Sequence, residues 1–192
     1  MKINLPNRLT ILRVILVPVF IACMLIPDAF VCGFVSALVF MVTAYTDMLD
    51  GKIARKNNLV TNFGKFMDPL ADKFMVFSAL LMITVRIDAL DGIMVWVSAL
   101  VFLRELGVTS LRLVCANTDA GVVSASFFGK AKTVTQVLAI IVILIEYALI
   151  EGRIINTMWI ASFILIVAMV VMTIGSGIDY LKTYGKYINP NE

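Results

Sequence analysis

The stretch TDMLDGKIARKNNLVTNFGKFMDPLADK, residues 46–73, places four aspartates, four lysines and one arginine between two long apolar runs. The chain around it is strongly hydrophobic. Of its 192 residues, 61% are hydrophobic and only 15% are charged, whereas a soluble domain carries about 25% charged residues. Ionisable residues are rare in membrane-spanning segments and mark functional sites where they occur. We therefore expect an integral membrane protein whose function depends on this stretch.

Six apolar segments are predicted to be helices, because backbone groups in lipid must be hydrogen-bonded within the segment. Most approach about 20 residues, the length that crosses the hydrocarbon core of a bilayer. The predicted fold class is all-α: one polytopic membrane domain over residues 1–192, with six transmembrane helices and no signal peptide to remove. Residues 4–13 mix leucines with polar residues and are expected to form a short N-terminal interfacial segment. The six segments cover 9–26, 30–49, 66–86, 93–115, 133–150 and 155–178.

The positive charges predict the orientation in the membrane. Six crossings place both termini on one side, and all 16 Lys and Arg residues except Arg86 and Arg153 then lie on that side. Because basic residues accumulate in cytoplasmic loops, both termini are predicted to be cytoplasmic. The charged stretch at 46–73 would then face the cytoplasm from the inner membrane.

Histidine and cysteine usage limits the possible chemistry. The chain contains no histidine, which excludes a histidine general base, a phosphohistidine intermediate and a histidine metal site. Cys23, Cys32 and Cys115 are odd in number and are not spaced like metal ligands, so we interpret them as packing residues without a disulfide. Acid–base or metal chemistry must therefore use carboxylates, lysine, tyrosine or cysteine.

The four aspartates form two pairs. Asp47 and Asp50 are three residues apart, and Asp68 and Asp72 are four apart, so each pair shares one face of a helix. Four converging carboxylates repel one another unless cations lie between them. Mg²⁺ and similar hard cations prefer carboxylate oxygens, and two such ions about 4 Å apart form a site for phosphoryl transfer.

The residues between the two pairs suit a phosphate-containing ligand. Gly51 and Ala54 have almost no side chain, so a bulky ligand can approach the helix backbone. Arg55 can bind a phosphate, and Gly64 would allow close approach in the connecting loop. The alternative is a set of Asp–Lys and Asp–Arg pairs among the lipid headgroups, but such pairs do not require small residues on the same face.

The pattern D-x2-D-G-x2-A-R-x8-G-x3-D-x3-D, from Asp47 to Asp72, resembles the signature of the CDP-alcohol phosphatidyltransferase family at every fixed position. Members transfer the phosphatidyl group of a CDP-linked lipid to an alcohol and release CMP. The resemblance implies a homodimer with two Mg²⁺ or Mn²⁺ ions, CDP-diacylglycerol as donor and no nucleic-acid partner. It assigns metal binding to Asp47, Asp50, Asp68 and Asp72, the general base to Asp72, and donor binding to Gly51, Ala54, Arg55 and Gly64.

Three further stretches resemble the bacterial branch of the family that uses glycerol 3-phosphate as acceptor: residues 4–18, 103–113 and 129–136. A phosphorylated acceptor needs extra cations. GKAKTVTQ at 129–136 places lysines at a predicted helix start, where free N–H groups favour phosphate. The resemblance puts Thr10, Arg13 and Glu105 near the substrate pocket. It implies acceptor-phosphate binding by Arg104, Arg112, Lys130, Lys132 and Thr133.

Three alternatives remain open. A sister enzyme of the family would use inositol phosphate, inositol or serine as acceptor. A small cation transporter would use the aspartates as an ion path, although transporters usually carry acids near the membrane midplane or show inverted repeats. A purely structural membrane subunit would not require eight fixed residues at fixed spacing.

Overall fold

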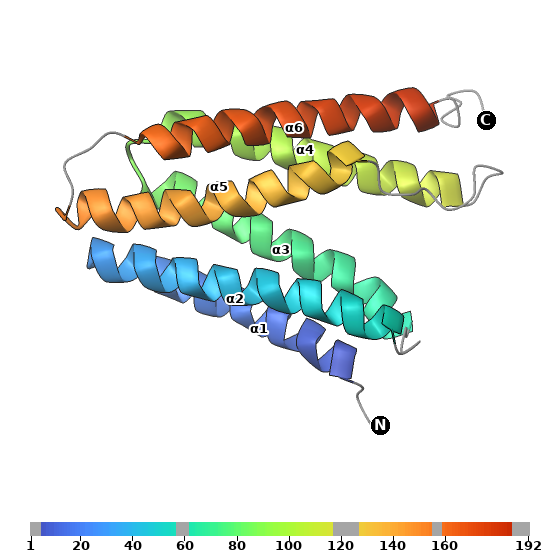
Figure 1. Cartoon of the computed structure of the whole chain (residues 1–192), viewed down its shortest axis with the longest axis horizontal. Helices are drawn as coiled ribbons and strands as arrows, with labels where there is room; N and C mark the ends of the chain where they lie inside the picture. Colours follow the sequence, from blue (N-terminus) through green and yellow to red (C-terminus); the bar gives the residue numbers. More distant parts are fainter. Residues whose placement is uncertain (1–4, 57–61, 117–126, 155–158, 186–192) are drawn as a thin grey trace. The chain divides into compact units, whose positions relative to one another are not determined.

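The computed structural model describes residues 5–56, 62–116, 127–154 and 159–185. Within these ranges the chain is all-helical and contains no strand, which confirms the predicted class (Figure 1). The helices are α1 (Leu5–Met24), α2 (Ala29–Lys56), α3 (Asn62–Arg86), α4 (Asp91–Ala116), α5 (Phe127–Glu151) and α6 (Ile160–Tyr184).

Several helix ends differ from the predicted segments. The first helix is continuous from Leu5, so the described residues of the predicted interfacial segment form the first half of α1, and their place at the membrane surface stays a prediction. Pro6 lies in the first turn, where its missing N–H costs no hydrogen bond. The fifth helix begins at Phe127 and the sixth ends at Tyr184, because polar residues at helix ends extend beyond the apolar run.

Five of the helices, all except α3, are long and apolar enough to cross a bilayer. Large apolar side chains are exposed on the helices: Val85 of α3 and Trp96 and Leu103 of α4 are 75%, 77% and 74% exposed. Helix α3 falls outside this group because Asp68, Asp72 and Lys73 lie in its first half. The uncharged residues 74–85 span about 18 Å at 1.5 Å per residue. The chain is a multi-pass membrane protein.

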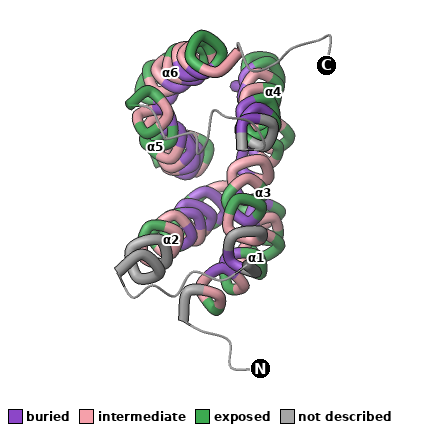
Figure 2. Tube along the Cα trace, turned by 90° about the vertical axis from the view of Figure 1, so that its right-hand side faces the viewer, coloured by how far each residue is buried: buried purple, intermediate pink, exposed green. Residues whose placement is uncertain are grey.

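The contacts of the chain divide it into two compact units. Unit 1 comprises residues 1–94 and 140–159, and unit 2 comprises residues 95–139 and 160–192. Along the helices of both units, buried positions alternate with exposed ones in a helical period (Figure 2).

In unit 1, α1 packs against α2 and α3. The rings of Phe20 and Phe40 lie 6.1 Å apart in the α1–α2 contact. Gly33 of α2 lies so close to α5 that an added Cβ would be 2.5 Å from the carbonyl oxygen of Leu144. Arg86, at the end of α3, donates hydrogen bonds to the carbonyl oxygens of Ile26 (2.8 Å) and Pro27 (3.2 Å). These contacts tie the end of α3 to the end of α1.

In unit 2, α6 buries a single stripe of residues spaced alternately four and three apart. This 3.5-residue period is that of helices packed at a shallow angle. The stripe begins with a serine, continues with two apolar residues and carries three hydroxyl groups toward its C-terminal end. It consists of Ser162, Ile166, Met169, Thr173, Ser176 and Tyr180.

The three cysteines are free, with Cys32 and Cys115 buried and Cys23 half-buried. The expectation that no disulfide staples the chain is confirmed.

Candidate active site

Helix α2 carries the first half of the aspartate pattern. Asp47 pairs with Arg13 of α1, with 2.7 Å between Arg13 Nη1 and Asp47 Oδ1. The Arg13 side chain is 1% exposed, whereas that of Asp47 is 45% exposed. A buried arginine requires a charged or hydrogen-bonding partner, so Arg13 holds Asp47 in the last third of α2 while leaving the carboxylate accessible.

Helix α3 carries the second half. Asp68 accepts a hydrogen bond from Thr10 Oγ1 of α1 at 2.5 Å, and Thr10 is itself buried. Asp72 lies one turn later and is exposed. Two α1 side chains, three residues apart, therefore contact two aspartates that are far from them in the sequence. The sequence placed Thr10 and Arg13 near the substrate pocket only by resemblance; their partners come from the structure.

The structure describes the other residues of the pattern only in part. The backbone of Asp50, Gly51, Ala54 and Arg55 continues α2, but the side chains at residues 50–56 lie outside the described part of the structure. Gly64 was expected in the connecting loop. This expectation is wrong, because Gly64 is buried within α3. A single helical glycine costs about 1 kcal/mol relative to alanine, which is small enough for packing to offset.

The described carboxylates have the right donor type for a hard divalent cation. Asp68 and Asp72 share a face of α3, and carboxylate oxygens are the ligands that Mg²⁺ prefers. Among the side chains that the structure describes, no three acidic or cysteine groups gather as a ligand cluster. The chemistry of the donors fits a divalent cation, and the geometry of the predicted two-metal centre stays a prediction.

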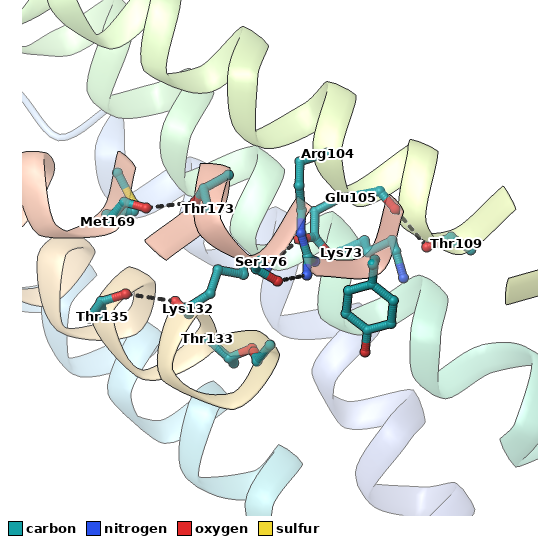
Figure 3. A network of polar contacts seen from close by, with 12 residues as sticks. Lys73, Arg104, Glu105, Thr109, Lys132, Thr133, Thr135, Met169, Thr173 and Ser176 are labelled. Carbon is teal, nitrogen blue, oxygen red and sulfur yellow. Dashed lines mark hydrogen bonds and ion pairs between the residues drawn. The ribbon is translucent and has the colours of Figure 1, made fainter. Parts of the chain in front are cut away.

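The polar residues of unit 2 form a separate network, drawn in Figure 3. Arg104 Nη1 lies 2.9 Å from Glu105 Oε1, and Lys132 Nζ donates to the same oxygen. The side chains of Arg104 and Lys132 are 10% and 5% exposed. Two nearly buried cations therefore share one carboxylate, which leaves this part of unit 2 positively charged.

Helix α6 completes the network with two side chains. Arg104 also donates to Ser176 Oγ, and Arg112 Nη2 donates to Tyr180 Oη. Ser176 and Tyr180 were not identified from the sequence. Their spacing of four residues would have suggested a shared helix face, but the predicted sixth segment ended at residue 178.

The remaining predicted acceptor residues lie near the start of α5. Lys130 is exposed in the first turn, whereas Lys132 and Thr133 lie in the second turn. Thr133 Oγ1 donates to the carbonyl oxygen of Gly129 at 3.2 Å. Only the first four N–H groups of a helix lack an intrahelical partner, so the helix-start argument applies to residues 127–130.

The chain belongs to the CDP-alcohol phosphatidyltransferase family, whose model matches residues 3–180. A CDP-diacylglycerol–glycerol-3-phosphate 3-phosphatidyltransferase of Bacillus subtilis is 42% identical over 154 residues, 74% of this chain and 77% of the relative. A protein of the same name from Haemophilus influenzae is 36% identical over 184 residues, 95% of this chain and 94% of the relative.

A probable phosphatidylglycerophosphate synthase of Mycobacterium tuberculosis is 34% identical over 180 residues, which cover 93% of this chain and 80% of that protein. The resemblance first seen in residues 47–72 thus extends over most of the chain. The chain is a transferase of this family, and the family is generally dependent on a divalent metal.

Proposed function

We propose that the protein transfers the phosphatidyl group of CDP-diacylglycerol to the 1-hydroxyl of sn-glycerol 3-phosphate, giving phosphatidylglycerol phosphate and CMP. The observation that carries this proposal is the complete aspartate pattern at 47–72 in a chain that matches relatives bearing this activity in their names over most of their length. The cationic network of unit 2 supports an acceptor that carries its own phosphate.

The metal-binding residues would be Asp47, Asp50, Asp68 and Asp72, with two Mg²⁺ or Mn²⁺ ions. Bound divalent ions act as Lewis acids that neutralise phosphoryl oxygens and stabilise the departing CMP. Within the chain itself, Arg13 and Thr10 orient Asp47 and Asp68. Such supporting contacts to ligand carboxylates fix their position.

Asp72 would act as the general base. It is exposed on α3 and is therefore accessible to a substrate hydroxyl. In the proposed step, Asp72 takes the proton from the 1-hydroxyl as its oxygen attacks the β-phosphorus of CDP-diacylglycerol. The bond from this phosphorus to the oxygen bridging the two phosphates breaks, and that oxygen leaves with CMP.

Substrate binding is assigned to two groups of residues. Gly51, Ala54, Arg55 and Gly64 would bind the CDP part of the donor. The phosphate of glycerol 3-phosphate would be bound by Arg104, Arg112 and Lys132, with Lys130 and Thr133 nearby on α5. The first three are cations that meet shared partners in unit 2.

We further propose six crossings of a bacterial inner membrane, with both termini and the aspartates on the cytoplasmic side. Helix α3 would be the crossing that raises the number from five to six. Its residues Asp68, Asp72 and Lys73 would lie at the headgroup level, and the uncharged residues 74–85 would lie in the hydrocarbon. The distribution of lysine and arginine supports this orientation. A homodimer is the predicted assembly.

The test is CMP release from CDP-diacylglycerol by the purified protein in detergent with Mg²⁺. Glycerol 3-phosphate is compared with inositol phosphate, inositol and serine. We expect release that depends on glycerol 3-phosphate. CMP release with another acceptor would retain the aspartate assignment but reject glycerol 3-phosphate as the acceptor. The absence of CMP release with every acceptor would reject the transferase reaction.

The aspartate assignment has its own test. Asp50→Asn and Asp68→Asn remove one charge each with little change in shape, so both variants should fold normally and lose turnover. Full activity of either variant in the same assay would contradict the assigned metal site.

A further inference from the structure

The end of the buried stripe of α6 carries two hydroxyl-bearing residues that meet arginines of α4. Ser176 and Tyr180 are four residues apart and therefore share one helix face, and both are buried. Ser176 accepts a hydrogen bond from Arg104, and Tyr180 accepts one from Arg112. The two arginines, both predicted to bind the acceptor phosphate, thus share supports from a single helix face.

Tyr180 contacts both arginines at once. The guanidinium carbon of Arg104 lies 5.6 Å from the centre of its ring, and that of Arg112 lies 5.0 Å from it. Both distances are within the range of cation–π attraction. The arginines are eight residues apart on α4, about 12 Å along the helix axis. Because both guanidinium groups contact the same ring, the two positive charges lie closer together than the spacing of the residues along the helix.

The supports that α6 supplies are electrically neutral. A phenol ring, a phenol hydroxyl and a serine hydroxyl hold the guanidinium groups without cancelling their charge. Glu105 is an acidic partner in this network, and it is shared by Arg104 and Lys132. Arg104, Arg112 and Lys132 contribute three positive charges and Glu105 one negative charge, so the net charge is +2.

We infer that Tyr180 is a positioning residue for the acceptor: with Ser176, it holds Arg104 and Arg112 through neutral groups, so that their charges remain available to the phosphate of glycerol 3-phosphate. This inference rests on the proposed function. Tyr180 acts through the arginines and is not itself assigned a contact with substrate.

Tyr180 also packs in the core of unit 2, with Val108, Leu111 and Cys115. A test must therefore separate loss of packing from loss of positioning. Tyr180→Phe keeps the ring and removes only the hydroxyl that accepts from Arg112. Tyr184, whose ring stacks on Tyr180 at 6.1 Å, provides the matched control. It lies on the same helix and packs against the same core, and the contacts described for it include neither arginine.

The first experiment measures KM for each substrate separately in Tyr180→Phe, Tyr180→Leu and Tyr184→Phe. A hydrogen bond to a charged group is worth about tenfold in binding. We expect Tyr180→Phe to raise the KM for glycerol 3-phosphate about tenfold and Tyr180→Leu to raise it further. The KM for CDP-diacylglycerol should be unchanged, and Tyr184→Phe should resemble the wild type. An equal rise in both KM values, or no rise in Tyr180→Phe, would overturn the inference.

The second experiment tests neutrality with a pair of variants matched in shape. Ser176→Asn and Ser176→Asp introduce the same bulk, but only the aspartate adds a negative charge. If the role of Ser176 is to hold Arg104 without neutralising it, Ser176→Asp should raise the KM for glycerol 3-phosphate at least about tenfold above Ser176→Asn. A lower KM in Ser176→Asp than in Ser176→Asn would show that the network needs only an anchor, and the inference would fail.

A binding measurement keeps this inference separate from the proposed reaction. Inorganic phosphate should raise the thermal unfolding midpoint of the wild type and of Tyr184→Phe in detergent, since a ligand that binds the folded state stabilises it. The rise should be reduced in Tyr180→Phe. If the wild type released no CMP yet showed this pattern, the reaction would be rejected and the anion site retained. Equal stabilisation of all three proteins would reject the positioning role.

Discussion

Thr10 and Arg13 show how single side chains of an apolar helix prepare a charged site. Both are buried in α1, and each contacts one aspartate of the pattern: Thr10 contacts Asp68 and Arg13 contacts Asp47. Neither contact depends on a neighbour in sequence, since Thr10 and Asp68 are 58 residues apart. Their physical effect is to restrict the rotamers of the carboxylates before any ligand arrives.

Replacing Thr10 by valine should weaken the response to metal. Valine has nearly the shape of threonine but cannot donate to Asp68, and the loss of a contact that orients a metal ligand typically costs 10–100-fold in metal affinity or activity. We expect the Mg²⁺ concentration for half-maximal CMP release to rise about tenfold, and Thr10→Ser to stay near the wild type. The buried Thr43, which bonds its own helix at Val39 O, supplies the control Thr43→Val. The same Mg²⁺ response in Thr10→Val and the wild type would contradict this role.

Arg153 is a second residue whose effect is local. It has φ 56°, in the left-handed region, and follows the end of α5. Arg153 N–H donates to Ile150 O at 3.0 Å and Ile154 N–H to Leu149 O at 3.0 Å. This pair of bonds is the Schellman motif, in which glycine usually takes the left-handed position.

Arg153→Gly should therefore stabilise the protein. A non-glycine residue in this conformation costs about 1–2 kcal/mol, and the free energy of unfolding in detergent should rise by about 1 kcal/mol. Arg153→Ala removes the same charge but keeps the backbone cost, so it should give no such gain. Equal stabilisation by both variants would show that charge, not backbone conformation, is responsible.

At the scale of elements, the close approach of α2 to α5 depends on Gly33. A Cβ at this position would lie 2.8 Å from both the backbone nitrogen and the Cβ of Ala148, in addition to its contact with Leu144 O. Backbone atoms cannot move aside as a flexible side chain can. The two helices would have to separate, and their packing contacts would be lost. Small residues serve this purpose in helix contacts within membranes.

Gly33→Ala should accordingly lower stability by about 1–3 kcal/mol, the usual cost of overpacking. Alanine otherwise favours a helix over glycine by about 1 kcal/mol. Gly107→Ala, on α4, introduces the same methyl group where nothing lies within 4 Å, so it should be neutral or stabilising. Thermal unfolding of both variants in detergent measures the difference. A Gly33→Ala protein as stable as Gly107→Ala would contradict the close contact.

At the scale of the whole molecule, the part of the chain that the structure describes has an unusually apolar surface around a core that is itself mainly apolar. Large apolar side chains are exposed along the helices, whereas several hydroxyl groups and two cations, Arg13 and Lys132, are buried. In lipid the apolar side chains lie in a favourable environment, and the buried Thr10, Arg13 and Lys132 have polar partners within the protein. The charged first half of α3 is the exception, and α3 is the helix whose crossing of the membrane is a proposal.

Accessibility to a membrane-impermeant thiol reagent tests the proposed crossings. Single cysteines replace Asp28, Asp88, Arg153 and Lys182 in a variant in which the native cysteines are replaced by alanine. In right-side-out vesicles, Asp28→Cys, Asp88→Cys and Arg153→Cys should react, and Lys182→Cys should react only after the membrane is opened. If α3 did not cross, Asp28 and Asp88 would react from opposite sides.

The sequence by itself determined the helical class, the family and the residues of the aspartate pattern. Lipid permits few backbone conformations, so long apolar runs imply helices, and the chemistry of the pattern depends on residue type and spacing, which are local. Gly64 shows that residue type alone does not predict where a helix begins. Glycine suggests a loop, but α3 begins at Asn62 and continues through Gly64. Helix ends depend on packing and capping more than on hydrophobicity.

Only the tertiary structure decided which side chains support the site. Nothing in the local pattern indicates that Thr10 meets Asp68, or that Ser176 and Tyr180 support two arginines about 70 residues earlier. These contacts join helices that are distant in the sequence, and their partners are set by how the helices pack. Helical periodicity reports which face of a helix is buried, but it carries no information about what lies against that face.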